Sequence, residues 1–221
     1  MLYIVSTPIG NLKDITLRAL EVLKAVDLIA AEDTRHTGIL LKHYGIKTPL
    51  TSYFEHNELK KADHLLRLLK EGKNVALVTD AGTPGISDPG YRLVKLAREN
   101  SIPMTVVPGA CALVAALSLS GLPTDSFVFA GFLPVKQGAR RKKLEEFKSE
   151  TRTVIFYESP HRLLKALEDI KAVLNDPTIV VVREITKKFE ETRTAPAGEM
   201  IEHFSKQRPQ GEFVIAFNTR V

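Results

Sequence analysis

The sequence contains a single cysteine, Cys111, so it can form no internal disulfide. Disulfides are typical of oxidising compartments, and one lone cysteine favours the reducing cytoplasm. No apolar run approaches the length of about 18 residues that a membrane-spanning helix needs. The apolar start has no basic segment before it and meets Pro8 and Gly10 at once. We therefore expect a first strand there, no signal peptide and no membrane partner.

The common catalytic and metal signatures are also missing. There is no GxGxxG, no GxxxxGK[ST], no HExxH and no GxSxG motif. The six histidines are scattered and do not pair at ligand spacing with each other or with Cys111. A zinc site is therefore not expected, and we predict no metal site.

What is present is ordinary for a globular protein. Of the 221 residues, 44% are hydrophobic, which is enough for a sizeable core, and the length allows one large or two small domains. The formal net charge of +5 is a mild lean toward polyanionic partners.

The first half alternates strictly between apolar strands and amphipathic helices. Strands are expected near residues 2–6, 28–31, 48–53, 74–79 and 103–107, with a helical pattern after each. Near-continuous apolar strands separated by helices are typical of a mostly parallel sheet covered on both faces. This pattern predicts an N-terminal α/β domain over residues 1–119.

The pattern changes at residues 120–125, which read Ser-Gly-Leu-Pro-Thr-Asp. Beyond them, some strands follow one another without a helix between, which predicts a mixed or antiparallel sheet. The closing strand, within residues 211–218, alternates Phe213, Ile215 and Phe217. We therefore predict a second α/β domain over residues 120–221, and a two-domain α/β fold.

Four loops rich in glycine, proline and small residues each follow a predicted strand: residues 7–14, 80–89, 108–112 and 157–160. The carboxyl ends of parallel strands share one sheet edge, so the first three loops should converge. Each loop alone could be a simple strand-to-helix turn. Together they favour a ligand cleft completed by the second domain. Acids such as Asp80 and Glu158 suit a nucleoside carrying positive charge better than a triphosphate.

Five motifs, in order, make these loops recognisable: STPIGNL at 6–12, AEDTR at 31–35, TDAGTPGISDPG at 79–90, VPGA at 107–110 and FYESPHR at 156–162. With them the chain closely resembles the ribosomal RNA small subunit methyltransferase I family. That resemblance implies the tetrapyrrole methylase fold, with S-adenosylmethionine between two domains. It also implies methyl transfer to the ribose 2′-hydroxyl of a cytidine in the decoding region of 16S ribosomal RNA.

The resemblance also implies roles for particular residues. Thr83 stands where the wider fold usually has an acid, so a carboxylate role there moves to Asp80 or is lost. The expected cofactor-binding residues are Pro8, Gly10, Asp80, Ala81, Gly82, Thr83, Ile86, Ser87, Cys111, Ala112, Tyr157, Ile185 and Ala216.

A ribose hydroxyl is a weak nucleophile, so a general base or a group that stabilises the developing alkoxide is expected. The candidate bases are Asp80, Glu158 and Glu184, and the sequence does not rank them. Lys13, Arg35 and Arg162 are candidates to orient a phosphate or stabilise charge.

A basic run at 136–143 suggests where RNA is held. Basic residues at a helix start oppose the helix dipole, which favours a phosphate partner over a merely solvated face. The expected RNA-binding residues are Lys136, Arg140, Arg141, Lys142, Lys143 and Arg162.

Two other functions stay open on the residues alone. One is a methyltransferase of the same fold that acts on a corrin-type ring, and the other is a nucleoside-binding module without catalysis. The favoured interpretation implies 16S ribosomal RNA within the small subunit as substrate. It also implies a homodimer, because enzymes of this fold commonly dimerise. The expected location is the cytoplasm.

Overall fold

The computed structural model describes residues 1–220. It divides into two compact units, Met1–Cys111 and Ala112–Val221. Helix α5 (Ala112–Leu119) belongs to the second unit, whereas the sequence pattern placed the domain boundary after that helix. No helix of the described residues is long and apolar enough to cross a membrane.

The first unit is built on a parallel sheet with strand order β3-β2-β4-β1-β5. Its strands are β1 (Leu2–Val5), β2 (Leu28–Ala31), β3 (Leu50–Ser52), β4 (Val75–Val78) and β5 (Met104–Val107). All four residues of β4 are buried, as expected of an apolar run in the middle of a parallel sheet.

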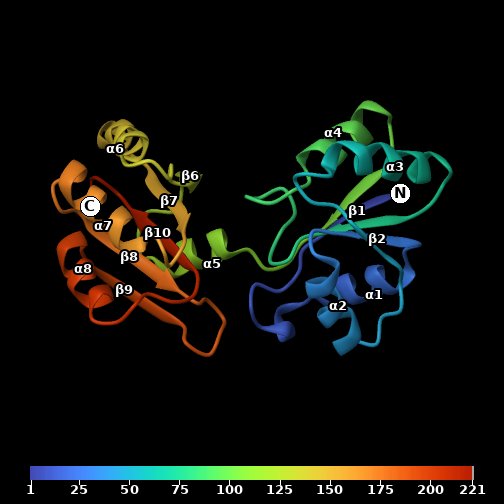
Figure 1. Cartoon of the computed structure of the whole chain (residues 1–221), viewed down its shortest axis with the longest axis horizontal. Helices are drawn as coiled ribbons and strands as arrows, with labels where there is room; N and C mark the ends of the chain where they lie inside the picture. The colour runs from blue at the N-terminus through green and yellow to red at the C-terminus, as the bar shows by residue number, and fades with distance from the viewer. Residues whose placement is uncertain (221) are drawn as a thin grey trace. The chain divides into compact units, whose positions relative to one another are not determined.

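Helices cover both faces of this sheet (Figure 1). They are α1 (Leu17–Ala25), α2 (Thr34–His43), α3 (Glu58–Lys70) and α4 (Tyr91–Glu99), with a short 3₁₀ turn, η1 (Leu12–Asp14). One core cluster joins α1 and α2 to the sheet through Leu23 and Leu41, and another joins α3 and α4 through Leu65 and Leu93. The predicted parallel α/β architecture of this half is confirmed.

The second unit has a mixed sheet with strand order β6-β7-β10-β8-β9. Its strands are β6 (Phe127–Phe132), β7 (Thr153–Glu158), β8 (Thr178–Arg183), β9 (Glu191–Pro196) and β10 (Phe213–Phe217). Strands β6 and β7 are parallel, and the other neighbours are antiparallel. The predicted mixed sheet is therefore confirmed.

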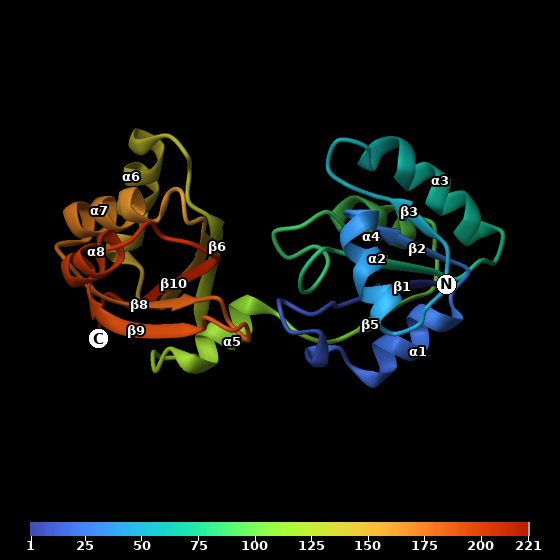
Figure 2. The same cartoon turned by 60° about the horizontal axis from the view of Figure 1, so that its bottom comes forward.

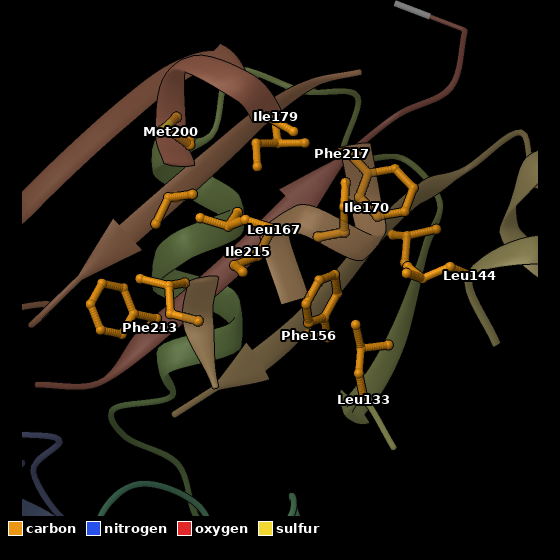
Figure 3. Packing of buried hydrophobic residues seen from close by; sticks show 14 of the residues in the cluster. Leu133, Leu144, Phe156, Leu167, Ile170, Ile179, Met200, Phe213, Ile215 and Phe217 are labelled. Atoms are coloured by element: carbon orange, nitrogen blue, oxygen red, sulfur yellow. The ribbon is translucent and has the colours of Figure 1, made fainter. Parts of the chain in front are cut away.

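Helices α6 (Gln137–Glu146), α7 (Leu163–Leu174) and α8 (Ala197–Ser205) share one core with this sheet, and a 3₁₀ turn, η2 (Phe147–Ser149), follows α6. Figure 3 shows the alternate residues Phe213, Ile215 and Phe217 of β10 in that core, beside Leu167 of α7. Helix α5 packs against β7 and β10 (Figure 2). Successive side chains of β10 thus point to opposite faces of the sheet, and Phe213, Ile215 and Phe217 point into the core shared with α7.

Candidate functional site

The loops that follow β1 and β4 are held together by their backbones. The Thr7 amide donates to the Gly82 carbonyl at 2.9 Å, and the Gly82 amide donates back to the Thr7 carbonyl at 3.1 Å. The Thr7 hydroxyl also donates to the Thr79 carbonyl at 3.0 Å. The two loops therefore form one structure at the carboxyl edge of the sheet.

Thr83 connects these two loops to a third. Its hydroxyl is 2.9 Å from the hydroxyl of Ser6 and donates to the carbonyl of Ala110 at 3.3 Å. Ser6, Thr83 and Ala110 belong to the loops after β1, β4 and β5. The predicted convergence of these three loops is confirmed. The uncharged hydroxyl of Thr83 forms the hydrogen bonds that link them.

Glycine is required where these loops meet. Gly82 has a φ of +88°, and a Cβ there would lie 3.3 Å from Cγ2 of Ile9. A side chain at this position would strain the backbone and press on the β1 loop. The neighbouring residues Ala81, Gly85, Ile86 and Ser87 are exposed, so the loop presents small residues and accessible backbone to a ligand.

An acidic group lies at the ends of the adjacent strands β2 and β4. The Asp33 amide donates to Oδ1 of Asp80 at 3.0 Å, and the Asp80 amide donates to Oε2 of Glu32 at 3.3 Å. Burial raises the pKa of the Glu32 carboxyl, and the charges of Asp80 and Asp33 raise it further. Sequence reasoning assigned Glu32 no role, although its motif was noted; the pairing of β2 with β4 explains why it meets Asp80.

A pocket of about 230 Å³ opens beside Asp80. It is bounded by the β1 loop, by helix α2 and by the end of β4, and is lined by Thr7, Pro8, Gly10, Leu12, His36, Thr37, Ile39, Leu40, Thr79 and Asp80. The hydroxyls of Thr37 and Thr79 are buried and have no hydrogen-bond partner within the described part of the chain. The pocket therefore combines an acid and apolar walls, and two of its lining residues carry buried hydroxyls without partners in the described residues.

Comparison with known proteins identifies the family. Residues 1–201 match the sequence model of the tetrapyrrole (corrin/porphyrin) methylases. Ribosomal RNA small subunit methyltransferase I of Escherichia coli O157:H7 is 56% identical over 97% of this chain and 76% of its own length. The protein of the same name from Thermotoga maritima is 48% identical over 98% of this chain and 97% of its own.

The chain belongs to the ribosomal RNA small subunit methyltransferase I family. The resemblance stated from its motifs is thus confirmed, and the chain is a methyltransferase.

Solved structures support the fold. Diphthine synthase superposes with a TM-score of 0.74 at 15% identity, covering 98% of this chain and 88% of that one. Uroporphyrin-III C-methyltransferase of Thermus thermophilus, complexed with S-adenyl homocysteine, superposes with a TM-score of 0.67 at 20% identity, covering 99% and 98%. The predicted tetrapyrrole methylase fold is confirmed.

The loops of the first unit leave parts of the main chain accessible at the carboxyl edge of the sheet. The three joined loops offer exposed backbone at Ala81, Gly85 and Gly109, where a larger ligand can approach the main chain. Of the predicted cofactor residues, Pro8 and Gly82 are buried within the joined loops, whereas Gly10, Ile86 and Ser87 are exposed. Cys111 and Ala112 follow the β5 loop and are partly exposed.

The three cofactor positions predicted in the second unit differ in accessibility. The Tyr157 hydroxyl accepts a hydrogen bond from the Leu113 amide at 3.1 Å, and its ring lies edge-on to Phe129 and Phe132. Ile185 is partly exposed. Ala216 is only 3% exposed, because it lies within β10, between its antiparallel neighbours β7 and β8.

Glu158 of the methyltransferase is fully buried and paired. Arg162 donates from Nε to Oε1 of Glu158 at 2.8 Å, and its guanidinium carbon lies 5.9 Å from the centre of the Phe132 ring. The Ser159 amide donates to the same carboxylate oxygen at 2.8 Å. Arg162 is therefore engaged in an internal ion pair, which opposes its predicted role in RNA binding.

Glu184 links the end of β8 to the residue that precedes β10. It accepts hydrogen bonds from Nζ of Lys187 at 2.9 Å and from the Glu212 amide at 3.0 Å. Burial alone would raise the pKa of Glu184, but the bonds from Lys187 and Glu212 outweigh it and lower this pKa. A carboxylate stabilised in this way is a poor proton acceptor, so the arrangement favours a structural role.

The two cations predicted near the acids are exposed. The Arg35 side chain is 90% exposed and pairs with Asp33 at 2.6 Å, which holds the pKa of Asp33 well below its usual range. Lys13 lies exposed in η1. Both are placed at the edge of the unit that carries the pocket.

The basic run corrects one prediction. Arg140 is only 4% exposed, and its guanidinium bonds Asp169 at 2.6 Å and the Val135 carbonyl at 2.9 Å. It holds α6 against α7 and has no free donor face for RNA, so its assignment to RNA binding was wrong. The charge pattern failed here because Asp169, its buried partner, lies 29 residues away in the chain.

The other residues of the run remain at the surface. Arg141 is half exposed and shares Asp169, while Lys143 pairs with Glu146 at 2.7 Å. Lys136 and Lys142 are exposed and form no ion pair within residues 1–220. These two lysines are the most available cations of the run.

Proposed function

We propose that this chain transfers a methyl group from S-adenosylmethionine to the ribose 2′-hydroxyl of a cytidine in the decoding region of 16S ribosomal RNA. The observation that carries this proposal is identity of about half over nearly the whole chain with proteins named ribosomal RNA small subunit methyltransferase I. The joined loops after β1, β4 and β5 support it, since they supply a small-residue surface at a sheet edge.

The chemistry is an in-line displacement at a methyl group. The cofactor supplies a methyl on a positively charged sulfur, and the protein holds the ribose oxygen opposite that sulfur. The loops around Gly10, Ala81 and Gly82 and around Cys111 are proposed to bind the cofactor. Tyr157 and Ile185 are proposed as its contacts in the second unit, and the burial of Ala216 leaves it the least favoured contact.

Asp80 is the proposed general base. Of the three candidates it is the one that lines a pocket, and its Oδ1 is already oriented by the Asp33 amide. Glu158 is neutralised by Arg162, and Glu184 by Lys187. Within the described residues Asp80 forms no such ion pair.

RNA binding is proposed for Lys136, Arg141, Lys142 and Lys143, without Arg140. Lys136 just before α6 and Arg141 and Lys142 within it are exposed and Lys143 is partly exposed, which supports this; the ribosomal small subunit is the proposed setting. Lys13 and Arg35 are proposed to contact phosphates near the pocket. We also propose a cytoplasmic homodimer; the exposed Val114 and Leu119 of α5 offer apolar surface for a subunit contact.

A methyltransferase acting on a corrin-type ring is less well supported. The pocket beside Asp80, at about 230 Å³, is smaller than the 300–1,000 Å³ of common ligand pockets. A nucleoside-binding module without catalysis needs no general base, so it does not explain why Asp80 lines the pocket.

The test is methyl transfer from labelled S-adenosylmethionine to small subunits isolated from cells that lack this protein. Digestion to nucleosides should place the label in 2′-O-methylcytidine. Label in a methylated base, or only in an added tetrapyrrole, would contradict the proposal.

The general base is tested by Asp80→Asn. A missing base should lower kcat by about 100-fold or more. Asp63→Asn, an exposed acid on α3, is the matched control and should leave kcat unchanged. Equal kcat values for the two variants would exclude Asp80 as the base.

A further inference from the structure

Two residues that line the pocket beside Asp80, Thr37 and Thr79, carry buried hydroxyls without partners in the described part of the chain. Thr37 is 2% exposed and Thr79 is 1% exposed, and neither hydroxyl has a hydrogen-bond partner within the described residues. Buried polar groups are nearly always satisfied, so an orphan of this kind calls for an explanation. Both residues line the same pocket although they come from different elements, α2 and the end of β4.

We infer that this pocket receives one nucleobase of the RNA, that of the nucleotide being methylated, and that Thr37 and Thr79 hydrogen-bond to its polar edge. The inference rests on the proposed function and names the substrate subsite within it. Enzymes that do chemistry on a base turn it out of the stack into a closely fitting pocket and bond its edge there, and we extend this mode of binding to the base that carries the reacting ribose.

The lining matches one flat, polar-edged ring. Leu12, Ile39 and Leu40 supply apolar walls for the faces of a base, and Ile39 is 64% exposed, with no other use in the first unit's cores. A hydroxyl can donate or accept, so two of them can satisfy neighbouring ring and exocyclic atoms of a pyrimidine. Such a base in the pocket would bring its own ribose close to Asp80, which lines the same pocket and is partly exposed.

The pocket adjoins the joined loops that we propose to bind the cofactor and lies on the side of the β1 loop that packs toward α2. Gly82, Thr83 and Ala110 join the β1 loop from the side of β4 and β5, whereas the pocket is closed by α2. Only Pro8, Gly10 and Asp80 are common to the pocket and to the predicted cofactor residues. The two ligands would therefore meet at Asp80, as methyl transfer requires.

The test uses Thr37→Val and Thr79→Val, which keep the side-chain shape and remove the hydroxyl. Thr37→Ser and Thr79→Ser keep the hydroxyl. Thr105→Val is the matched control, since Thr105 lies on β5 outside the pocket. For each full-length variant we would measure the melting temperature, the Kd for S-adenosylmethionine by calorimetry, and kcat/KM on small subunits that lack the methyl group.

Each valine variant should lose about tenfold in kcat/KM, because one hydrogen bond to the substrate is removed and a base atom is left unsatisfied. The serine variants should retain most activity. The Kd for S-adenosylmethionine should stay within about twofold, and the melting temperature should stay level or rise, since an unpaired buried hydroxyl stabilises nothing.

Three results would overturn the inference. The first is an unchanged kcat/KM in both valine variants. The second is weaker binding of S-adenosylmethionine, which would assign the pocket to the cofactor, and the third is a lower melting temperature, which would assign the hydroxyls a structural partner. Failure of the wild-type protein to methylate the subunit would instead contradict the proposed function, on which the inference rests. The wild-type control thus separates the two failures.

Discussion

Burial and pairing decide what each acid of this protein can do. Glu158 and Glu184 each form an ion pair and accept a backbone amide, and at Glu184 the bonds from Lys187 and Glu212 lower the pKa. Glu32 has burial and two neighbouring acids, which disfavour its charge. Groups with pKa values perturbed in this way gather at functional sites, and Glu32 contacts the proposed base, Asp80.

The raised pKa of Glu32 predicts a pH-dependent effect on stability. Because the pKa of Glu32 is higher in the folded state than in the unfolded state, its protonation adds to the free energy of unfolding. This contribution is fully present below the unfolded-state pKa, near 4.5, and is lost as the pH rises through the folded-state pKa. Glu32→Gln, which stays neutral, should therefore gain in free energy of unfolding relative to wild type as the pH rises from 4 to 7. Urea unfolding at both values measures it.

The amide oxygen introduced by Glu32→Gln can still accept a hydrogen bond from the Asp80 amide, so the variant isolates the charge. Glu71→Gln, an exposed acid, is the control and should show no such trend. A gain that is larger at pH 4 than at pH 7 would contradict the assigned pKa direction.

Arg140 and Arg141 are adjacent in sequence and differ in burial, which separates a structural cation from a surface one. Arg140→Ala leaves the fully buried Asp169 with one partner fewer and should cost about 3–5 kcal/mol of unfolding free energy. Arg141→Ala, at a half-exposed position, should cost about 1 kcal/mol or less. Urea titration of both variants measures the difference, and equal losses would contradict this division of roles.

At the scale of elements, the loops at the carboxyl edge depend on glycine conformation. Gly82→Ala should lower the unfolding free energy by about 1–3 kcal/mol, because its φ of +88° disfavours a side chain. Gly38→Ala, at a position inside α2 with nothing within 4 Å of the new Cβ, should raise it by about 0.5–1 kcal/mol. Thermal unfolding compares them, and a neutral Gly82→Ala would show that the loop relaxes freely.

The elements of the fold could be predicted from sequence because their signals are local. Apolar runs such as Val75–Val78 and the periodic leucines of α3 identify strands and helices directly. The start of α7 was less predictable. Ser159 followed by Pro160 is typical of a helix start, yet α7 begins at Leu163, since residues 159–162 form a turn held by bonds to the Ser159 carbonyl.

The site could be predicted only where it depends on chain order. Parallel strands bring their following loops together, so the meeting of the loops at Thr7, Gly82 and Ala110 was foreseeable. The pairing of Glu32 with Asp80, and of Arg140 with Asp169, depends on which strands and helices become neighbours. Periodicity and motif spacing do not contain that information.

At the scale of the whole molecule, the net charge of +5 is small, so RNA affinity must rest on a few placed cations. Removing Lys136 and Lys142 together by alanine substitution should reduce the slope of log affinity against log salt by about 1.4, since each phosphate contact on single-stranded RNA contributes about 0.7. Binding of labelled 16S RNA across salt concentrations measures the slope.

The control for this pair is Lys165→Ala/Lys206→Ala, which removes the same charge from exposed positions on α7 and just after α8. It should leave the slope near that of the wild type. If the two double variants shift the slope equally, the start of α6 has no special part in RNA binding.

Methylation of one cytidine ribose in 16S ribosomal RNA is the activity on which the proposals for Asp80, the pocket and the basic run all depend. The most direct measurement maps ribose methylation of small-subunit RNA from cells that lack this protein, and from the same cells after the gene is returned as wild type or as Asp80→Asn. We predict one missing 2′-O-methylcytidine in the decoding region, restored by the wild type and not by Asp80→Asn. A complete set of ribose methyl groups in the cells that lack the protein would contradict the proposed activity.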